Sequence, residues 1–229
     1  MLEQYGLALC HCEKCGDTGQ IVERDGWEIR ARECECMNRR RSLRSLYRSG
    51  LRELVGLYTF KAFLTPDAET RAMKEKALQY CQDTPAWFFV SGWPGSGKTH
   101  ICTAICSRFI AEGRRVYYCK WTEESGTLKA QKAMQDTPPE YLERLELLRT
   151  VPVLYIDDFL KNKPTDADLR LAFDIINARY NVPSLRTVIS SNRTLTEILK
   201  LDEATGSRIA ERAKGYILRS PSVNRRLAV

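Results

Sequence analysis

The chain has 229 residues, of which 43% are hydrophobic and 28% charged, and its formal net charge is +7. This length fits one ordinary domain with an appendage, and the apolar fraction can supply a core. No stretch approaches the roughly 18 apolar residues of a membrane span, and the start of the chain lacks the basic region of a signal peptide, so we expect a cytosolic protein. The moderate positive charge fits a nucleic acid or an acidic protein partner, although many enzymes are equally basic.

The first 36 residues contain five of the nine cysteines. Four of these form two pairs on either side of a hairpin expected around Asp25-Gly26, and they are Cys12, Cys15, Cys34 and Cys36. Two thiolate pairs at this spacing indicate a tetrahedral zinc site of structural purpose, and the CGDTG turn resembles a zinc knuckle. Because the second pair is CxC rather than CxxC, Cys10 or His11 could replace one ligand, and an iron–sulfur cluster or free thiols are the alternatives.

Residues 37–56 follow with six arginines and one glutamate, and their apolar spacing predicts a basic helix. From Thr65 the pattern alternates helices and strands, which predicts a parallel α/β sheet covered on both faces. Helices are expected at 65–81, 97–113, through a long stretch ending at Leu148, and at 166–181 and 207–215, and strands at 86–92, 114–120, 151–159 and 185–192. The remaining cysteines lie among apolar neighbours and are expected to be buried thiols, namely Cys81, Cys102, Cys106 and Cys119.

The stretch SGWPGSGKTH at residues 91–100 has the spacing of a phosphate-binding loop between a strand and a helix. Its glycines let backbone amides wrap phosphate oxygens, and the helix that follows turns its positive dipole end toward the same anion. Lys98 is expected to reach the β- and γ-phosphates and Thr99 to ligate Mg²⁺. The predicted contacts to a nucleoside triphosphate are Gly92, Trp93, Pro94, Gly95, Ser96, Gly97, Lys98, Thr99 and His100.

Two carboxylates end the strand VLYIDDF, at the edge where open α/β sheets bind ligands. Asp157 is the expected outer-shell partner of the magnesium ion, and Asp158 could polarise the attacking water as its proton acceptor. A second carboxylate favours hydrolysis over binding alone, and a solvated acidic turn is the simpler alternative.

Three further residues fit a hydrolytic site. Asn192 ends the strand LRTVISSN and could orient the lytic water, although by itself it would be taken for a turn asparagine. Arg208 and Arg212 are four residues apart and can share a helix face. They could reach the γ-phosphate of a neighbouring subunit as an arginine finger, or they could be solvated surface residues.

The motifs GWPGSGKTH, VPVLYIDDF, VISSN and GSRIAERAKG, in this order and spacing, resemble AAA+ helicase loaders of the DnaC/DnaI type. The likeness covers nearly the whole chain and is greatest to the phage- and prophage-encoded branch of Gram-positive bacteria, for which a cysteine-rich leader and a basic helix are typical. It implies a Walker A motif at 92–99, a Walker B motif at Asp157 and Asp158, sensor 1 at Asn192, and an arginine finger at Arg212 or Arg208.

The resemblance also implies the division of the chain. It predicts a zinc-binding module at 1–36, a basic helix and linker at 37–64, and an AAA+ ATPase domain at 65–229, with no room for a C-terminal lid and no assigned sensor 2 arginine. Many relatives carry Asp-Glu where this chain has Asp157-Asp158. The second carboxylate then lies about one methylene further back, so hydrolysis is expected to be slow.

The function implied is ATP-dependent loading of a DnaB-type replicative helicase onto single-stranded DNA, by a homo-oligomer that forms on ATP binding and needs no membrane. The zinc module and basic helix would hold the helicase. One alternative is an IstB-type transposition helper that assembles on duplex DNA and normally lacks the cysteine leader. Another is a zinc adaptor that binds ATP only to fold, against which the paired aspartates and arginines argue. The basic tail from Arg208 onward could be a DNA track or a solvated surface.

Overall fold

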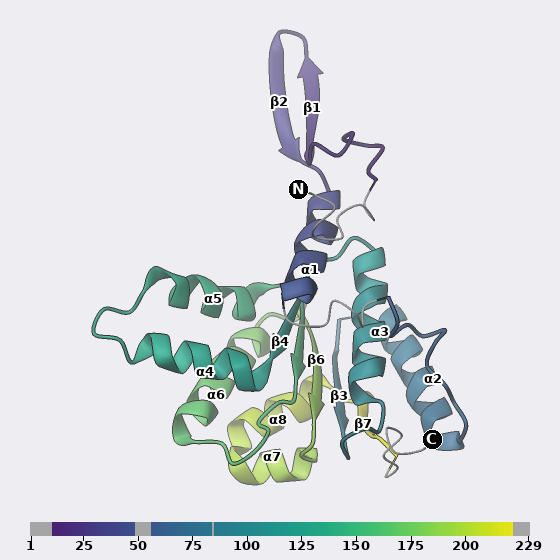
Figure 1. Cartoon of the computed structure of the whole chain (residues 1–229), viewed down its shortest axis with the longest axis vertical. Helices are drawn as coiled ribbons and strands as arrows, with labels where there is room; N and C mark the ends of the chain where they lie inside the picture. Colours follow the sequence, from purple (N-terminus) through teal and green to yellow (C-terminus); the bar gives the residue numbers. More distant parts are fainter. Residues whose placement is uncertain (1–10, 49–55, 84, 222–229) are drawn as a thin grey trace.

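The computed structural model describes residues 11–48, 56–83 and 85–221, and its centre is a five-stranded parallel sheet (Figure 1). The strand order is β4-β5-β6-β3-β7. The strands are β3 (Trp87–Ser91), β4 (Val116–Lys120), β5 (Val153–Asp157), β6 (Arg186–Ser191) and β7 (Ile217–Arg219). The four predicted strands are confirmed. The fifth, β7, adds to β3 at the sheet edge and was missed because the sequence analysis treated it as part of a basic tail.

Helices cover both faces of the sheet, as predicted. Their bounds are α2 (Ala68–Gln82), α3 (Lys98–Ala111), α4 (Trp121–Lys132), α5 (Pro139–Thr150), α6 (Asp166–Tyr180), α7 (Leu195–Leu201) and α8 (Glu203–Arg212). Successive strand residues point to opposite faces, so Phe88 joins the core under α2 and α3 while Phe89 joins the core under α4 to α8. No helix in the described part of the chain has the length and apolar character to cross a bilayer.

The N-terminal part projects from one end of the sheet (Figure 1). β1 (Gln20–Asp25) pairs antiparallel with β2 (Glu28–Glu33), which confirms the predicted hairpin, and α1 (Cys36–Arg48) follows. α1 lies against β4, where Ser42 Oγ accepts a hydrogen bond from Val116 N at 2.8 Å. Leu43 is buried in the core under α3. Residues 49–55, which belong to the predicted helix 37–56, lie outside the described residues.

Candidate nucleotide-binding site and cysteine cluster

The glycine-rich loop joins the buried strand β3 to the start of α3. Gly92, Gly95 and Gly97 have φ angles of +138°, +78° and +93°. These values lie in the region that favours glycine, so the three glycines are required by the backbone path itself. α3 begins at Lys98, and its first amides have no acceptor within the helix. The loop therefore presents backbone donors and a helix N-terminus to one site, as an anion cradle requires.

Gly92 is also required by a close approach from β7. A Cβ at position 92 would lie 2.1 Å from Ser220 Oγ. Ser220 follows β7, its N–H donates to Ser91 O at 2.7 Å, and its Oγ lies 2.7 Å from Ser96 Oγ. The loop is thus braced by a residue that the sequence analysis did not assign. The short apolar run Tyr-Ile-Leu at 216–218 was the signal that could have revealed this strand.

Lys98 is buried within the loop that it follows. Its Nζ donates to the carbonyl oxygens of Gly92 and Trp93, both at 2.8 Å. Burial lowers the pKa of Lys98, while the charges of Asp158 and Asp157 act in the opposite direction. The structure therefore brings the predicted lysine and both predicted carboxylates together. A phosphate entering the loop would compete with the two carbonyl groups for the ammonium.

A cavity of about 270 Å³ opens beside the loop, and segment 58–64 forms its other wall. His100 stacks on Tyr58 with ring centroids 4.4 Å apart, and Phe63 meets the imidazole edge-on at 5.1 Å. Burial lowers the pKa of His100. The aromatic lining next to the phosphate cradle suits a nucleobase. Of these three rings, only that of His100 belongs to a residue predicted to contact the nucleotide. Tyr58 and Phe63 lie in a segment without a recognisable motif.

β5 ends at Asp157, and Asp158, the second carboxylate of the candidate site, directly follows the strand. Asp157 is buried and accepts hydrogen bonds from Tyr118 Oη at 3.0 Å and Tyr155 Oη at 2.9 Å. Asp158 has a φ of +55° and accepts a hydrogen bond from Lys161 Nζ at 2.8 Å. A positive φ at a residue other than glycine is uncommon and concentrates at functional sites. The backbone therefore turns sharply where the two carboxylates leave the sheet.

Asn192 directly follows β6, the strand between β5 and β3. Because parallel strands end at one edge, Asn192 leaves the sheet beside both the carboxylates and the glycine-rich loop. The next residue, Arg193, was not predicted to matter. It donates to Leu160 O at 2.9 Å and to Asn162 O, and both of these residues have positive φ angles. Arg193 thereby holds the strained segment that follows Asp158.

Arg208 and Arg212 lie away from the phosphate loop of their own chain. Arg208 Nε donates to Asn177 Oδ1 at 2.9 Å, in the part of α6 that leads toward β6. Arg212 donates to Pro183 O at 2.7 Å and lies over the ring of Trp87 at 5.7 Å. Trp87 begins β3 and Pro183 precedes β6, so Arg212 lies at the sheet edge opposite the glycine-rich loop. Within one chain, Arg212 and the glycine-rich loop therefore do not belong to the same site.

The glycine of the GSR motif is explained by helix packing. A Cβ at Gly206 would lie 2.9 Å from Leu199 Cα. α8 therefore approaches α7 at a distance that only glycine permits without a shift of one helix. The sequence analysis did not predict α7, although its capping box, in which Thr194 and Glu197 bond reciprocally, was visible as the spacing T-x-x-E.

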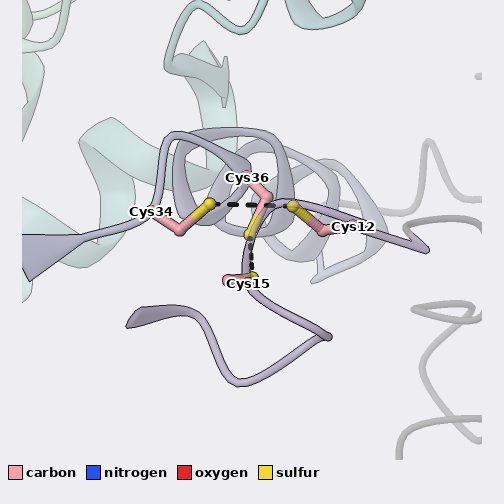
Figure 2. Close-up of side chains that lie close together, drawn as sticks. All are labelled: Cys12, Cys15, Cys34 and Cys36. Carbon is pink, nitrogen blue, oxygen red and sulfur yellow. Dashed lines mark hydrogen bonds between the residues drawn. The ribbon is translucent and has the colours of Figure 1, made fainter. Parts of the chain in front are cut away.

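Figure 2 shows the four predicted cysteines converging. All four sulfur atoms lie within 4.8 Å of one another. Cys12 Sγ lies 3.6 Å from Cys34 Sγ, and Cys15 Sγ lies 3.6 Å from Cys36 Sγ. Four thiolates around a metal with bonds of about 2.3 Å would be about 3.8 Å apart. The cluster therefore fits a tetrahedral metal ion, with one ligand of each contact pair from each end of the hairpin.

The turn around the cluster fixes which residues face it. His11 Nδ1 lies 3.1 Å from Asp17 Oδ2, and His11 is not among the converging ligands. Cys10, the other suggested substitute, lies outside the described residues. Burial opposes ionisation of Cys15, but the Gly19 backbone and the neighbouring thiols lower its pKa to about 7. In the same cluster, burial and the neighbouring thiols raise the pKa of Cys36, so the convergence of the four sulfur atoms, rather than the acidity of one thiol, indicates metal ligation. Asp17 also binds Arg40 of α1 at 2.6 Å, which ties the turn to the helix.

The fold and the site define an AAA+ nucleotide-binding protein with an N-terminal cysteine cluster. The family model described as IstB-like ATP binding protein matches residues 28–208, and the chain belongs to this family. The Bacillus subtilis (strain 168) protein YqaM is 32% identical over 204 residues, which are 82% of this chain and 63% of YqaM, so the chain spans less than two thirds of that relative.

Two further comparisons agree with this assignment. The replicative helicase loader DnaC of Escherichia coli (strain K12) is 25% identical over 205 residues, which are 88% of this chain and 81% of DnaC. A crystal structure of DnaI superposes with a TM-score of 0.58 at 19% identity, over 76% of this chain and 93% of that one. At this identity the superposition shows a shared fold.

We predict that Gly92→Ala lowers both the urea midpoint of unfolding and the affinity for ATP measured by calorimetry. The new Cβ would lie 2.1 Å from Ser220 Oγ, and a φ of +138° is unfavourable for alanine. Gly113→Ala is the control, because its φ is +78° but no atom lies within 4 Å of its Cβ. It should cost less stability and leave ATP affinity unchanged. The double variant Gly92→Ala/Ser220→Gly should recover part of the loss, and equal effects of the two alanines would contradict the account.

Cys34→Ser is expected to remove most of the metal that the purified protein carries. The wild-type chain should retain about one ion after desalting, measured by elemental analysis, because four thiolates complete a tetrahedral site. Cys81→Ser changes a thiol outside the cluster and should leave the metal content unchanged. A wild-type protein without metal, or a Cys34→Ser variant that keeps it, would show that the cluster is not a metal site.

Proposed function

We propose that this protein is an ATP-dependent loader of a DnaB-type hexameric helicase onto single-stranded DNA. The observation that carries the proposal is the gathering of the glycine-rich loop, Lys98, Asp157 and Asp158 at one sheet edge, in a chain aligned over 88% of its length with a replicative helicase loader. ATP bound at this site would be the energy source, and the relative indicates the class of partner protein. A cytoplasmic location follows from a role in DNA replication.

The nucleotide site is proposed to bind ATP with Mg²⁺. The residues from Gly92 to His100 would surround the phosphates, and Thr99 with Asp157 would hold the metal, which neutralises phosphate charge when bound. Asp158 would accept the proton of the attacking water and Asn192 would orient that water. Hydrolysis is expected to be slow. Asp158 is short for this role, and its carboxylate is already engaged by Lys161 at 2.8 Å.

The arginines support an assembly of several copies. Arg212 lies at the sheet edge opposite its own phosphate loop. The site around ATP would therefore be completed by Arg212 or Arg208 of the adjoining protomer. ATP binding would then favour the homo-oligomer, and loss of the γ-phosphate would weaken it. This cycle couples the nucleotide state to holding and releasing the partner.

The N-terminal part is proposed to hold the helicase. The four cysteines fit Zn²⁺, which binds thiolates tetrahedrally and would fix the hairpin onto α1. α1 presents exposed basic side chains, including Arg39 and Arg44. The module boundaries at 36 and 64 remain predictions, as does the contact of the AAA+ core with single-stranded DNA.

A transposition helper is the second candidate, and the observation that favours it is the description of the matching family as IstB-like. Such helpers assemble on duplex DNA. The cysteine cluster favours the loader, because it is an added module that DNA assembly by the core would not need. A loader should bind a hexameric helicase, whereas a transposition helper should assemble on duplex DNA.

The loader proposal is tested by light scattering after size-exclusion chromatography of the full chain mixed with the DnaB-type helicase of the same genome. A co-complex should form with ATP and be weaker with ADP. Lys98→Ala should remove the difference between the two nucleotides, because Lys98 would no longer contact the phosphates. Absence of a complex with any nucleotide, together with ATP-dependent filaments on duplex DNA, would replace the loader with the transposition helper.

Trans-complementation tests whether the arginines act between protomers. Lys98→Ala and Arg212→Ala should each reduce ATP hydrolysis strongly when assayed alone. Mixed together, they should regain part of the activity, because some interfaces would pair an intact loop with an intact arginine. The same mixture with Arg208→Ala shows which arginine is the finger. Arg170→Ala, on the exposed face of α6, is the control. No recovery with either arginine variant would contradict a finger supplied in trans.

A further inference from the structure

Hydroxyl groups from three neighbouring strands surround the carboxylate of Asp157. Tyr118 of β4 donates to Oδ2 at 3.0 Å, Tyr155 of β5 donates to Oδ1 at 2.9 Å, and Ser190 of β6 also donates to Oδ1. Tyr118 and Tyr155 are register partners in the sheet, and their rings pack edge to face with centroids 5.1 Å apart. All four side chains are buried, with Asp157 the most accessible at 8%. The carboxylate is therefore held in one orientation.

The two oxygens of this carboxylate are not equivalent. Oδ1 accepts hydrogen bonds from Tyr155, from Ser190 and from the backbone N–H of Asp158 at 3.1 Å. Among the described residues, Tyr118 is the donor recorded at Oδ2. A carboxylate offers about four acceptor positions over its two oxygens. Oδ1 is thus fully used, whereas Oδ2 keeps an acceptor position for a cation or a cation-bound water.

Tyr118 is suited to act as a permanent donor. A phenol keeps its proton at neutral pH, so the Tyr118 hydroxyl can donate to the Asp157 carboxylate. Its ring is fixed by Tyr155 on one side and by the core under α3. The position of the hydroxyl is therefore fixed, and it stays directed at Asp157 Oδ2. None of the motifs that define the nucleotide site includes this residue, because it lies on the preceding strand.

We propose that Tyr118 is a positioning residue that fixes Asp157 Oδ2 toward the Mg²⁺ of bound ATP. The proposal rests on the magnesium role of Asp157 in the proposed function. Tyr155 and Ser190 hold the opposite oxygen and set the plane of the carboxylate. Loss of Tyr118 would remove the donor that holds Oδ2, whereas loss of Tyr155 would leave Oδ1 with two other donors.

The test is the affinity for ATP, measured by calorimetry over a series of free Mg²⁺ concentrations and in EDTA. For Tyr118→Phe, we expect the Mg²⁺ concentration giving half of the affinity gain to rise by about tenfold, the range typical for loss of a partner that orients a metal ligand. Affinity in EDTA should stay unchanged, because metal-free binding does not use Asp157. Tyr155→Phe should shift the Mg²⁺ dependence distinctly less.

Tyr80→Phe is the matched control. Tyr80 is buried on the same face of the sheet and donates to Ala86 O at 3.2 Å, away from Asp157. It should lower the unfolding midpoint without changing the Mg²⁺ dependence. The proposal is overturned if Tyr118→Phe behaves like this control, or if Tyr155→Phe shifts the Mg²⁺ dependence as much. A wild-type protein that binds ATP equally well with and without Mg²⁺ would refute the magnesium role of Asp157 itself, and this proposal with it.

Discussion

The phosphate loop depends on how β3 is held between its two neighbours. At the point where β3 ends, Gly92 N donates to Ser191 O of β6 at 3.1 Å, and Ser91 O accepts from Ser220 N beyond β7 at 2.7 Å. The loop therefore starts from a backbone position that is fixed from both sides. Because Ser220 comes so close on the β7 side, a Cβ at position 92 would lie 2.1 Å from Ser220 Oγ. The sheet thus determines where the phosphate cradle lies before any ligand contact is made.

The same sheet gathers charge at one edge and leaves the arginines at the other. Lys98 is buried beside the charges of Asp157 and Asp158, which offset part of the cost of burying an ammonium group. Arg212 satisfies carbonyl groups at the opposite edge. Under the proposed function, a single chain therefore holds only part of the hydrolytic site. In the proposed account this incompleteness is useful, because ATP can be hydrolysed only where two protomers meet.

The sequence predicted those parts of the site that depend on residues close together in the chain. The glycine spacing, the carboxylates after an apolar strand, and the two cysteine pairs each follow from short-range pattern and chemistry. The structure places Lys98 beside the carboxylates and brings the four sulfurs together. The roles assigned to Lys98, Asp157 and Asp158, and those assigned to Asn192, Arg208 and Arg212, remain predictions.

The parts that escaped prediction depend on contacts between distant segments. β7 has three residues and forms only because β3 offers an open edge. The importance of Tyr118 lies in its hydrogen bond to Asp157, which is 39 residues further along the chain. Arg179 would have been placed on the surface by its charge, yet it is fully buried and donates to Val151 O and Arg186 O at 2.9 and 2.7 Å. No local pattern records such a partner.

The most direct test of the central claim is whether this protein places a helicase ring on DNA that has no ends. The DnaB-type helicase would be incubated with closed circular single-stranded DNA, and the amount retained on the circle would be measured after a salt wash. The account predicts retention that requires the wild-type chain and ATP and is lost with Lys98→Ala. Equal retention without the chain, or with Lys98→Ala, would contradict it.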